Sequence, residues 1–238
     1  MDSTKNISEK ALQADKKDVF SEVKATGFDT NIMTDNQEIP ELPANLSECR
    51  RITATGKMID LLDPQPEDID FNVIAHSLAK QCRWTGHTNL FYSVAQHSFL
   101  MAQHMPQPLQ AYALLHDAHE AYIGDIPHPL KAIMGPHLNT VTERLDAAIH
   151  AAAGLDWPLS PHHKNMIHMA DRAMARAEAE DLLRTDPAED NHFDSLPSRL
   201  VPHIRPVAWD RALDIFLDHL QRYVFCRTSN KGAANGIC

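Results

Sequence analysis

The strongest constraint on the fold is a run of apolar residues at helical spacing around a cluster of polar residues. These apolar positions are Ala111, Leu114, Leu115, Ala118 and Ala121. Strand alternation does not explain this spacing, so we predict one helix over residues 109–123. Positions 116–120 of that helix read His-Asp-Ala-His-Glu. The chain therefore places imidazole and carboxylate groups on a helix that also contributes to the core.

This pentad is typical of a metal site. In an α-helix His116 and Glu120 are four positions apart, so their side chains rise from the same face. Asp117 is displaced by about a quarter turn and can still reach an ion bound by His116. Imidazole and carboxylate together suit a divalent cation that keeps water or phosphate bound.

Two more polar residues occupy apolar stripes of other predicted helices. His97 lies in the helix predicted from residue 93 to 105, and Asp171 lies in the helix predicted from about 165 to 183. Polar side chains on core faces are costly unless they are paired. One cation bound by these two residues together with His116 and Asp117 would satisfy all four groups.

The order His…His-Asp…Asp on successive helices resembles the HD-domain metal-dependent phosphohydrolases. Three further strings resemble the branch that contains 5′-deoxynucleotidases and phage or prophage deoxynucleotide triphosphohydrolases of the dATP type. They read CRWTGH at 82–87, FYSVAQHS at 91–98 and GDIPHPLK at 124–131. The resemblance covers roughly residues 51–223 and implies an all-α helical bundle.

The resemblance also implies the metal and catalytic residues. The implied ligands of a divalent ion (Co, Mn, Zn, Ni or Mg) are His97, His116, Asp117 and Asp171. Four ligands leave about two positions of an octahedral ion open to water and phosphate. Glu120 would orient or protonate at the reacting phosphate, and Asp125 would hold the nucleophilic water or support the ligands.

Substrate contacts follow from the same strings. Arg83 and Lys131 would meet phosphate, while Trp84 would pack on sugar or base and His87 would lie near the substrate. The chain departs from the branch at Gln96, where classical monophosphatases carry Glu before the first metal-binding His. Which phosphate ester is cleaved therefore stays open.

The leading hypothesis for function is a metal-dependent phosphohydrolase acting on deoxynucleotides, as a triphosphohydrolase or as a 5′-deoxynucleotidase. One alternative is a hydrolase of a signalling nucleotide such as (p)ppGpp or a cyclic nucleotide. Another is a catalytically silent HD-type module that senses nucleotides. The presence of Arg83, Glu120 and Asp125 argues against the silent module, because such a module need not keep them.

Composition limits the partners that we expect. The formal net charge of the 238-residue chain is −10, which disfavours a stable nucleic-acid partner. The chain shows no long apolar run and no secretory signal, so we expect a cytoplasmic protein without a membrane segment. Its four cysteines lack metal-knuckle spacing. The expected partner is a small nucleotide, and assembly into a homo-oligomer is left open.

Three regions are expected along the chain. Residues 1–48 are polar and predict a flexible N-terminal extension, residues 49–226 predict the phosphohydrolase domain, and residues 227–238 predict a disordered tail. Residues 51–63 favour a small hairpin. The prolines between 127 and 136 predict a loop, and Thr140 with Glu143 predicts the capped start of the next helix. Residues 186–206 predict a long connection over the site.

Overall fold

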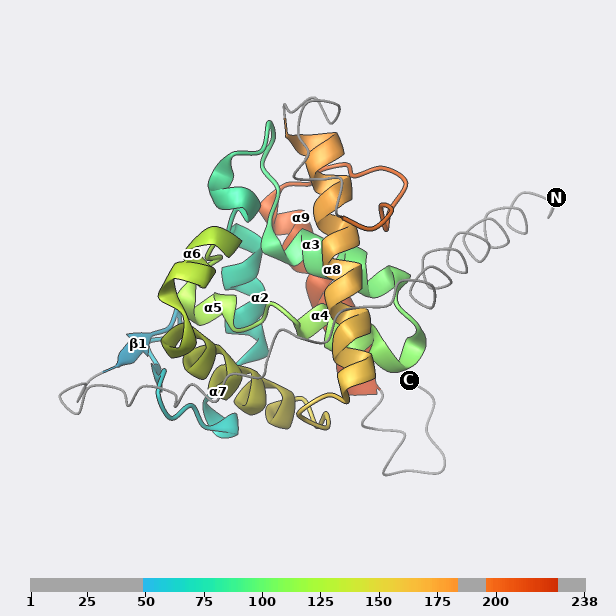
Figure 1. The fold of residues 1–238 in the computed structure, drawn as a ribbon. Helices are drawn as coiled ribbons and strands as arrows, with labels where there is room; N and C mark the ends of the chain where they lie inside the picture. Colours follow the sequence, from blue (N-terminus) through green and yellow to red (C-terminus); the bar gives the residue numbers. More distant parts are fainter. Residues whose placement is uncertain (1–48, 184–195, 227–238) are drawn as a thin grey trace.

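The computed structural model describes residues 49–183 and 196–226. The predicted N-terminal extension (1–48), the predicted tail (227–238) and residues 186–195 of the long connection lie outside the described residues. Helices make up most of the described part, and its single sheet has two strands, so the predicted all-α class is confirmed (Figure 1). No helix among the described residues is both long and apolar enough to cross a membrane.

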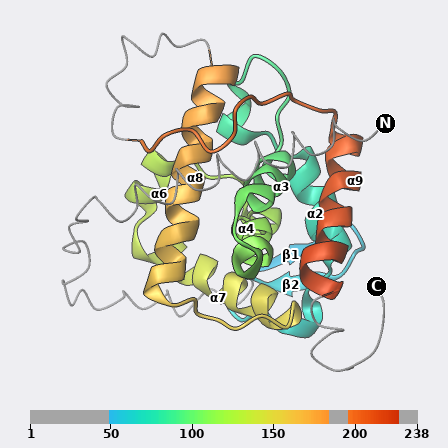
Figure 2. The same ribbon diagram turned by 90° about the vertical axis from the view of Figure 1, so that its right-hand side faces the viewer.

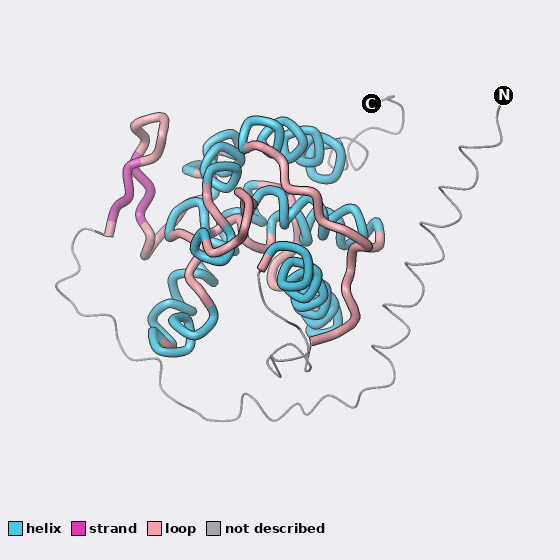
Figure 3. The backbone as a smooth tube through the Cα atoms, turned by 90° about the horizontal axis from the view of Figure 1, so that it is seen from above, coloured by secondary structure: helices cyan, strands magenta, loops and turns pink. Residues whose placement is uncertain are grey.

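The described elements follow one another in a simple order. The two strands are β1 (Arg50–Ile52) and β2 (Met58–Asp60). The helices are η1 (Pro66–Asp68), α2 (Phe71–Lys80), η2 (Arg83–Gly86), α3 (Val94–His104), η3 (Gln107–Leu109), α4 (Gln110–Leu115), α5 (Glu120–Ile123), α6 (His128–Met134), α7 (Pro136–Ala152), α8 (Pro161–Leu182), α9 (Trp209–His219) and η4 (Leu220–Phe225). The strands pair antiparallel in the predicted hairpin, which lies at the edge of the helical body (Figure 3).

Helix α3 is the centre of the helical body. It packs against α2, α4, α8 and α9, and Figure 2 shows it between these helices. Nearly every residue from Val94 to Ala102 is buried, so this helix faces protein on all sides. Small residues at Ala95, Ser98 and Ala102 allow neighbouring helices to approach closely. A polar side chain on α3 must therefore find its partner inside the protein.

Side-chain caps fix where the helices before and within the core begin. Asp70 accepts hydrogen bonds from Asn72 N at 2.8 Å and Val73 N at 3.4 Å, which starts α2. Ser93 accepts from Gln96 N at 3.2 Å and starts α3. Such caps typically contribute about 1 kcal/mol each. Both starts agree with the sequence prediction to within one residue.

The continuous helix predicted over residues 109–123 is wrong in its middle. Helix α4 ends at Leu115, residues 116–119 form turns, and α5 begins at Glu120. Within this stretch Ala118 N donates to Leu115 O at 3.0 Å, and Glu120 N donates to Asp117 O at 3.0 Å. These bonds span three residues, so the chain is wound more tightly than an α-helix and residues three apart share a face. Asp117 and Glu120 are therefore neighbours, and the expected four-residue relation between His116 and Glu120 does not hold.

Two further predictions need correction beyond this point. The predicted loop over 127–136 contains α6, which has no buried residue: its apolar residues Leu130, Ile133 and Met134 have helical spacing but are exposed. Helix α7 begins at Pro136 and not at Thr140. Proline at the first helical position has a suitable φ and needs no hydrogen-bond donor there. Thr140 lies inside the helix, where its hydroxyl donates to Pro136 O at 3.0 Å.

The described end of the long connection is bound to α8. Arg199 pairs with Glu180 at 2.9 Å and with Asp181 at 2.7 Å, and Asp181 also accepts from Ile204 N at 2.7 Å. Leu200 N donates to Ala173 O at 3.2 Å. This segment, which runs along α8 in Figure 2, leads into α9. The segment thus connects α9 to α8.

The contacts of Gln96 explain why glutamine stands here, where the monophosphatases that the sequence resembles carry glutamate. Its amide Nε2 donates to Arg205 O at 2.8 Å, and its Oε1 accepts from Val207 N at 2.9 Å. The side chain is buried and uses both its donor and its acceptor on the backbone of this segment. A carboxylate at this position would lack the donor that the Arg205 carbonyl requires.

We therefore predict that Gln96→Glu lowers the free energy of unfolding by roughly 1–3 kcal/mol at pH 8, the cost of an unsatisfied buried polar group. The loss should shrink at pH 5, because a protonated glutamate regains a donor. Urea denaturation at both pH values measures it. Gln221→Glu, at an exposed position, is the control and should stay within about 0.5 kcal/mol. Equal stability of Gln96→Glu and wild type at pH 8 would contradict this reading of the contact.

Candidate metal centre

Three segments bring the four predicted ligands together. Helix α3 supplies His97, the turn after α4 supplies His116 and Asp117, and α8 supplies Asp171. Because α3 packs against both α4 and α8, residues distant in sequence meet at the centre of the bundle. His97 is fully buried, and the side chain of Asp171 is 35% exposed. The cluster is therefore closed on the α3 side and open to solvent beside α8.

The distances between these side chains fit a shared cation. His97 Nε2 lies 3.2 Å from His116 Nε2 and 3.2 Å from Asp171 Oδ1. Asp117 Oδ2 lies 3.1 Å from His116 Nε2, and Asp171 Oδ1 lies 3.9 Å from it. Bond lengths of about 2.0–2.2 Å place neighbouring ligands of a divalent ion about 3–3.5 Å apart.

The hydrogen bonds behind the imidazoles set their tautomers. His116 Nδ1 lies 2.8 Å from Ala113 O, and a carbonyl can only accept, so this nitrogen donates. His97 Nδ1 lies 2.6 Å from Glu178 Oε1, which is also an acceptor. In their neutral forms both rings therefore direct the Nε2 lone pair into the cluster. This arrangement, with the second nitrogen bound to a carbonyl or carboxylate, is usual for metal-binding histidines.

An unpartnered buried atom also supports the fit. Asp171 Oδ1 is buried and makes no hydrogen bond with any described residue, although His97 Nε2 is close to it. A buried carboxylate oxygen is costly unless it is paired or binds a metal. Two imidazoles and two carboxylates form a donor set that suits a divalent transition metal. The ligand atoms of His97, His116 and Asp171 all lie within 4.8 Å of one another, so these three residues could hold such an ion, and Asp117 lies beside them against His116.

Charged side chains of both signs surround the two histidines and shift their pKa values. Burial lowers the pKa of His116, but the carboxylates of Asp117 and Asp171 outweigh burial and raise this pKa well above its usual value. Burial and Arg83 lower the pKa of His97, but Glu178 and Asp171 together outweigh them and raise this pKa. Burial opposes ionisation of Asp117, yet His116 and Arg83 hold its pKa far below the usual range. The carboxylates around the two imidazoles thus favour their protonated forms.

Arg83, the predicted phosphate contact, lies beside the metal ligands. Its side chain is only 12% exposed. Its guanidinium is 3.3 Å from Asp117, 3.8 Å from Asp171 and 3.3 Å from Glu178. Burial lowers the Arg83 pKa, but these carboxylates outweigh it and raise the pKa well above the usual value. A guanidinium held in this way adds a permanent positive charge next to the metal ligands.

The sequence prediction missed Glu178. This α8 residue is fully buried and accepts from Trp84 Nε1 at 2.9 Å in addition to its contacts with His97 and Arg83. It stands seven positions after Asp171, on the same helical stripe. A second acidic residue on that stripe was the signal that could have identified it.

Glu120 and Lys131 form the second part of the site. Glu120 is buried, and burial together with the charges of Asp117 and Asp125 raises its pKa to about 8. Lys131 Nζ lies 3.3 Å from Glu120 Oε1, and the other carboxylate oxygen is buried without a hydrogen bond to any described residue. Burial also raises the pKa of Asp125, whose N–H donates to Gln81 Oε1 at 3.1 Å. Glu120 can therefore carry a proton near neutral pH.

Of the remaining predicted contacts, Trp84 lies on η2 and His87 directly follows it. Trp84 is half-buried, and its indole N–H points at Glu178. Trp84 and Thr85 have φ values of 55° and 49°, in the left-handed region that is costly for residues other than glycine. Strained residues of this kind cluster at functional sites. His87 is exposed, and its ring makes no hydrogen bond or ion pair with the described residues of the site, so the structure does not bring it together with the others.

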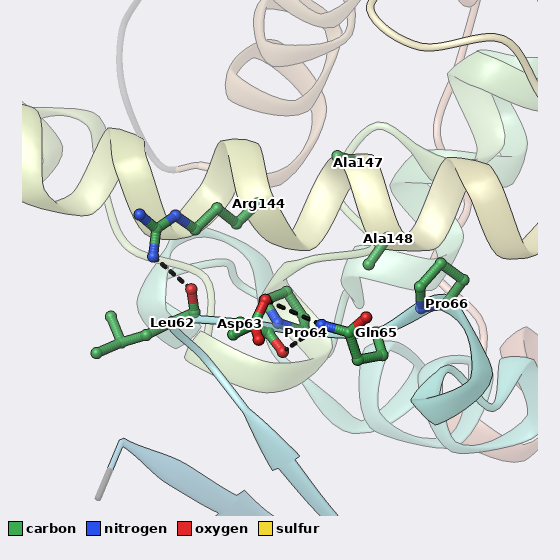
Figure 4. Close-up of a pocket in the computed structure, with 8 residues that line it drawn as sticks. All are labelled: Leu62, Asp63, Pro64, Gln65, Pro66, Arg144, Ala147 and Ala148. Carbon is green, nitrogen blue, oxygen red and sulfur yellow. Dashed lines mark hydrogen bonds between the residues drawn. The ribbon is translucent and has the colours of Figure 1, made fainter. Parts of the chain in front are cut away.

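A separate cavity of about 560 Å³ lies between residues 62–66 and α7 (Figure 4). Arg144 from α7 donates to Leu62 O at one side of it, and Ala147 and Ala148 form the helix wall. None of the predicted site residues lines this cavity. The candidate centre is therefore defined by converging side chains and not by this opening.

The raised pKa of Glu120 predicts a pH-dependent stability. The folded state prefers the protonated form, so ionisation of Glu120 reduces stability progressively from about pH 4.5, its ordinary value, to about pH 8. Glu120→Gln removes this loss. In the presence of a chelator, the unfolding free energy of Glu120→Gln minus that of wild type should increase between pH 5 and pH 9. Urea denaturation across this range measures the difference, and a constant difference would contradict the assignment.

Comparison with known families corrects two expectations. Residues 6–36 match the family model of the GapR-like DNA-binding domain. The matching model describes a DNA-binding domain and not a phosphohydrolase, so the assignment to the HD-domain phosphohydrolases is contradicted. The same match contradicts the expectation that the chain has no stable nucleic-acid partner. Formal charge gave no signal of this segment, because residues 6–36 themselves carry four lysines and six acidic residues.

Two curated proteins are similar to the chain over more than half of its length. An uncharacterized protein of Rhodobacter capsulatus is 40% identical over 144 residues, which cover 57% of this chain and 74% of that protein. The uncharacterized protein YfdR of Escherichia coli is 37% identical over 166 residues, which cover 70% of this chain and 90% of YfdR. With this identity over most of the length of both relatives, the chain belongs to the same protein family as these two proteins.

Proposed function

We propose that the domain predicted over residues 49–226 is a metal-dependent phosphohydrolase that acts on deoxynucleotides in the cytoplasm. The observation that carries the proposal is the convergence of His97, His116, Asp117 and Asp171 beside Arg83 and the buried Glu120, whose pKa burial raises to about 8. Hydrolysis of phosphate esters requires charge stabilisation more than covalent help from the protein. This cluster offers a cation site, a fixed guanidinium and a proton donor together.

Each group has a defined task in this proposal. A divalent ion, when bound, polarises a phosphoryl oxygen and lowers the pKa of water. Arg83 neutralises charge that spreads over the phosphoryl oxygens. Glu120 gives a proton to the leaving oxygen, because its raised pKa keeps it protonated near neutral pH. Lys131 orients Glu120 and attracts phosphate, and Asp125 accepts a hydrogen bond from the attacking water.

Selectivity for the sugar is proposed to depend on Trp84. The indole is fixed by its hydrogen bond to Glu178 next to Arg83, so its apolar face can pack against the sugar of a nucleotide whose phosphate meets Arg83. A 2′-hydroxyl against this face would clash or lose its hydrogen bonds. Such a misfit typically changes kcat/KM by about 10–200-fold. A hydrolase of signalling nucleotides would instead prefer ribonucleotides. A catalytically silent module would not turn over any nucleotide.

We expect the protein supplied with Mn²⁺ or Co²⁺ to hydrolyse dNTPs or dNMPs faster than their ribonucleotide counterparts. Glu120→Gln should bind metal and nucleotide but react about 10²–10⁴-fold more slowly, because it cannot donate the proton. Chromatography of the products separates triphosphate release from phosphate release. Turnover of Glu120→Gln at the wild-type rate would move the acid role to another residue.

A loss of metal is the expected effect of Asp117→Asn, because this change weakens a ligand and leaves the helices in place. His162→Ala is the matched control, since His162 is an exposed α8 residue outside the cluster. Metal content by elemental analysis and helix content by circular dichroism should separate the two variants. Metal retained by Asp117→Asn, or wild-type protein inert toward every nucleotide, would overturn the proposal.

A second activity is supported by the match at residues 6–36. We propose that this segment binds DNA. Its lysines are Lys10, Lys16, Lys17 and Lys24, and it carries six acidic residues. With so few cations we expect few phosphate contacts and a correspondingly shallow decrease of affinity with salt.

Fluorescence anisotropy with labelled duplex DNA tests this second proposal. The full chain should bind at low salt, and Lys16→Glu/Lys17→Glu should weaken binding and reduce its salt dependence. A protein that begins at Ser47 should lose DNA binding but keep its metal and helix content. Equal DNA binding with and without the segment would refute the assignment.

A further inference from the structure

We propose that Glu178 is a positioning residue that joins the metal ligand His97 to the substrate-facing pair Arg83 and Trp84. The inference rests on the proposed function only in taking a nucleotide as the substrate that Arg83 and Trp84 contact. The role of Glu178 toward His97 is argued from geometry alone. Glu178 lies on α8, while His97 lies on α3 and the pair lies on η2. One carboxylate would therefore fix three parts of the site relative to one another.

Both oxygens of Glu178 are used, and they serve different segments. Oε1 accepts from His97 Nδ1 at 2.6 Å. Oε2 accepts from Trp84 Nε1 at 2.9 Å and from Arg83 Nη2 at 3.3 Å. The side chain is fully buried, so these donors, and not solvent, compensate its charge. A buried ion with three protein donors has little freedom to change orientation.

The Oε1 contact determines how His97 presents its other nitrogen. With Nδ1–H donated to the carboxylate, the lone pair of Nε2 points toward His116 and Asp171. A carboxylate behind a metal-binding imidazole fixes the ring and increases its basicity. Loss of such a partner commonly reduces metal affinity by about 10–100-fold.

The Oε2 contacts determine where η2 lies. The left-handed backbone at Trp84 and Thr85 is unfavourable by itself and persists only where other contacts fix it. Arg83 N donates to Tyr92 O at 2.9 Å, which fixes the start of this turn. The indole bond to Glu178 fixes the side chain that follows. Trp84 is therefore oriented by the same residue that orients His97.

Glutamine cannot replace this carboxylate. His97 Nδ1–H and Trp84 Nε1–H both require an acceptor, and an amide has one oxygen and one NH₂ group. In Glu178→Gln one of the two donors must face the NH₂ group. The variant also leaves Arg83 without one of its carboxylates. Trp84→Phe, by contrast, removes only the indole donor and leaves Oε1 bound to His97 and Oε2 bound to Arg83.

The test measures Mn²⁺ affinity by titration calorimetry and the visible spectrum of the Co²⁺ form. Wild type, Glu178→Gln, Trp84→Phe and the control Glu180→Gln are compared, with circular dichroism as the test of folding. Glu180 is also on α8, but it pairs with Arg176 and Arg199 instead. We expect Glu178→Gln to lose about 10–100-fold in Mn²⁺ affinity and to change the Co²⁺ spectrum, while Glu180→Gln does neither.

Trp84→Phe should keep Mn²⁺ affinity within about twofold and raise the KM for nucleotide, whereas Glu178→Gln should affect both. Rescue by Glu178→Asp of part of the metal affinity would further support a carboxylate requirement. Wild-type affinity and an unchanged Co²⁺ spectrum in folded Glu178→Gln would overturn the inference. Metal binding by wild type without hydrolysis of any nucleotide would instead refute the proposed function and leave the role of Glu178 toward His97 intact.

Discussion

The buried carboxylates of Asp117 and Glu178 and the partly buried carboxylate of Asp171 impose the main constraint on this structure. Each is held among helices where solvent cannot compensate its charge fully, so positive charge must be supplied by the protein or by a bound ion. Arg83 supplies one permanent charge. The surrounding carboxylates raise the pKa values of His97 and His116 and so favour their protonated forms. A divalent cation would bring two positive charges to the same place and would compete with protons for the imidazoles.

This constraint explains why α3 lies at the centre of the bundle. A helix that is buried on all sides must satisfy each of its polar residues inside the protein. Gln96 and His97 are adjacent on α3, and the polar atoms of both have partners. The Gln96 amide is hydrogen-bonded to the backbone of residues 205–207, and the His97 ring contacts the charged cluster. The polar residues of α3 thus specify what must surround it. The apolar contacts alone would tolerate several arrangements of the neighbouring helices.

Much of the fold could be predicted because its signals are local. The caps at Asp70 and Ser93 and the turn at Gly124 mark helix ends by short-range chemistry. The metal ligands could be proposed because polar residues on apolar stripes require an explanation. The turn at 116–119 was missed because hydrogen bonds that span three residues and those that span four give nearly the same apolar spacing in the sequence.

Glu178 was missed because its partners lie on η2 and α3, and no local sequence pattern shows these partners. The family resemblance failed for another reason, since short shared strings indicate similar local chemistry and need not indicate common membership.

The distance between the metal ligands on α3 and α8 depends on a segment that contributes none of them. Residues 199–204 are bound to α8 through Asp181, and residues 205–207 are bound to α3 through Gln96. The segment therefore connects the helix of His97 to the helix of Asp171 by hydrogen bonds that do not involve the site. Because its contacts are mostly to backbone atoms, side-chain changes along it are better tolerated than changes at Gln96 or Asp181. Local opening of this segment would free α8 to move relative to α3 and would separate the two ligands. The stability of a structural connection thus sets the geometry that a metal would meet.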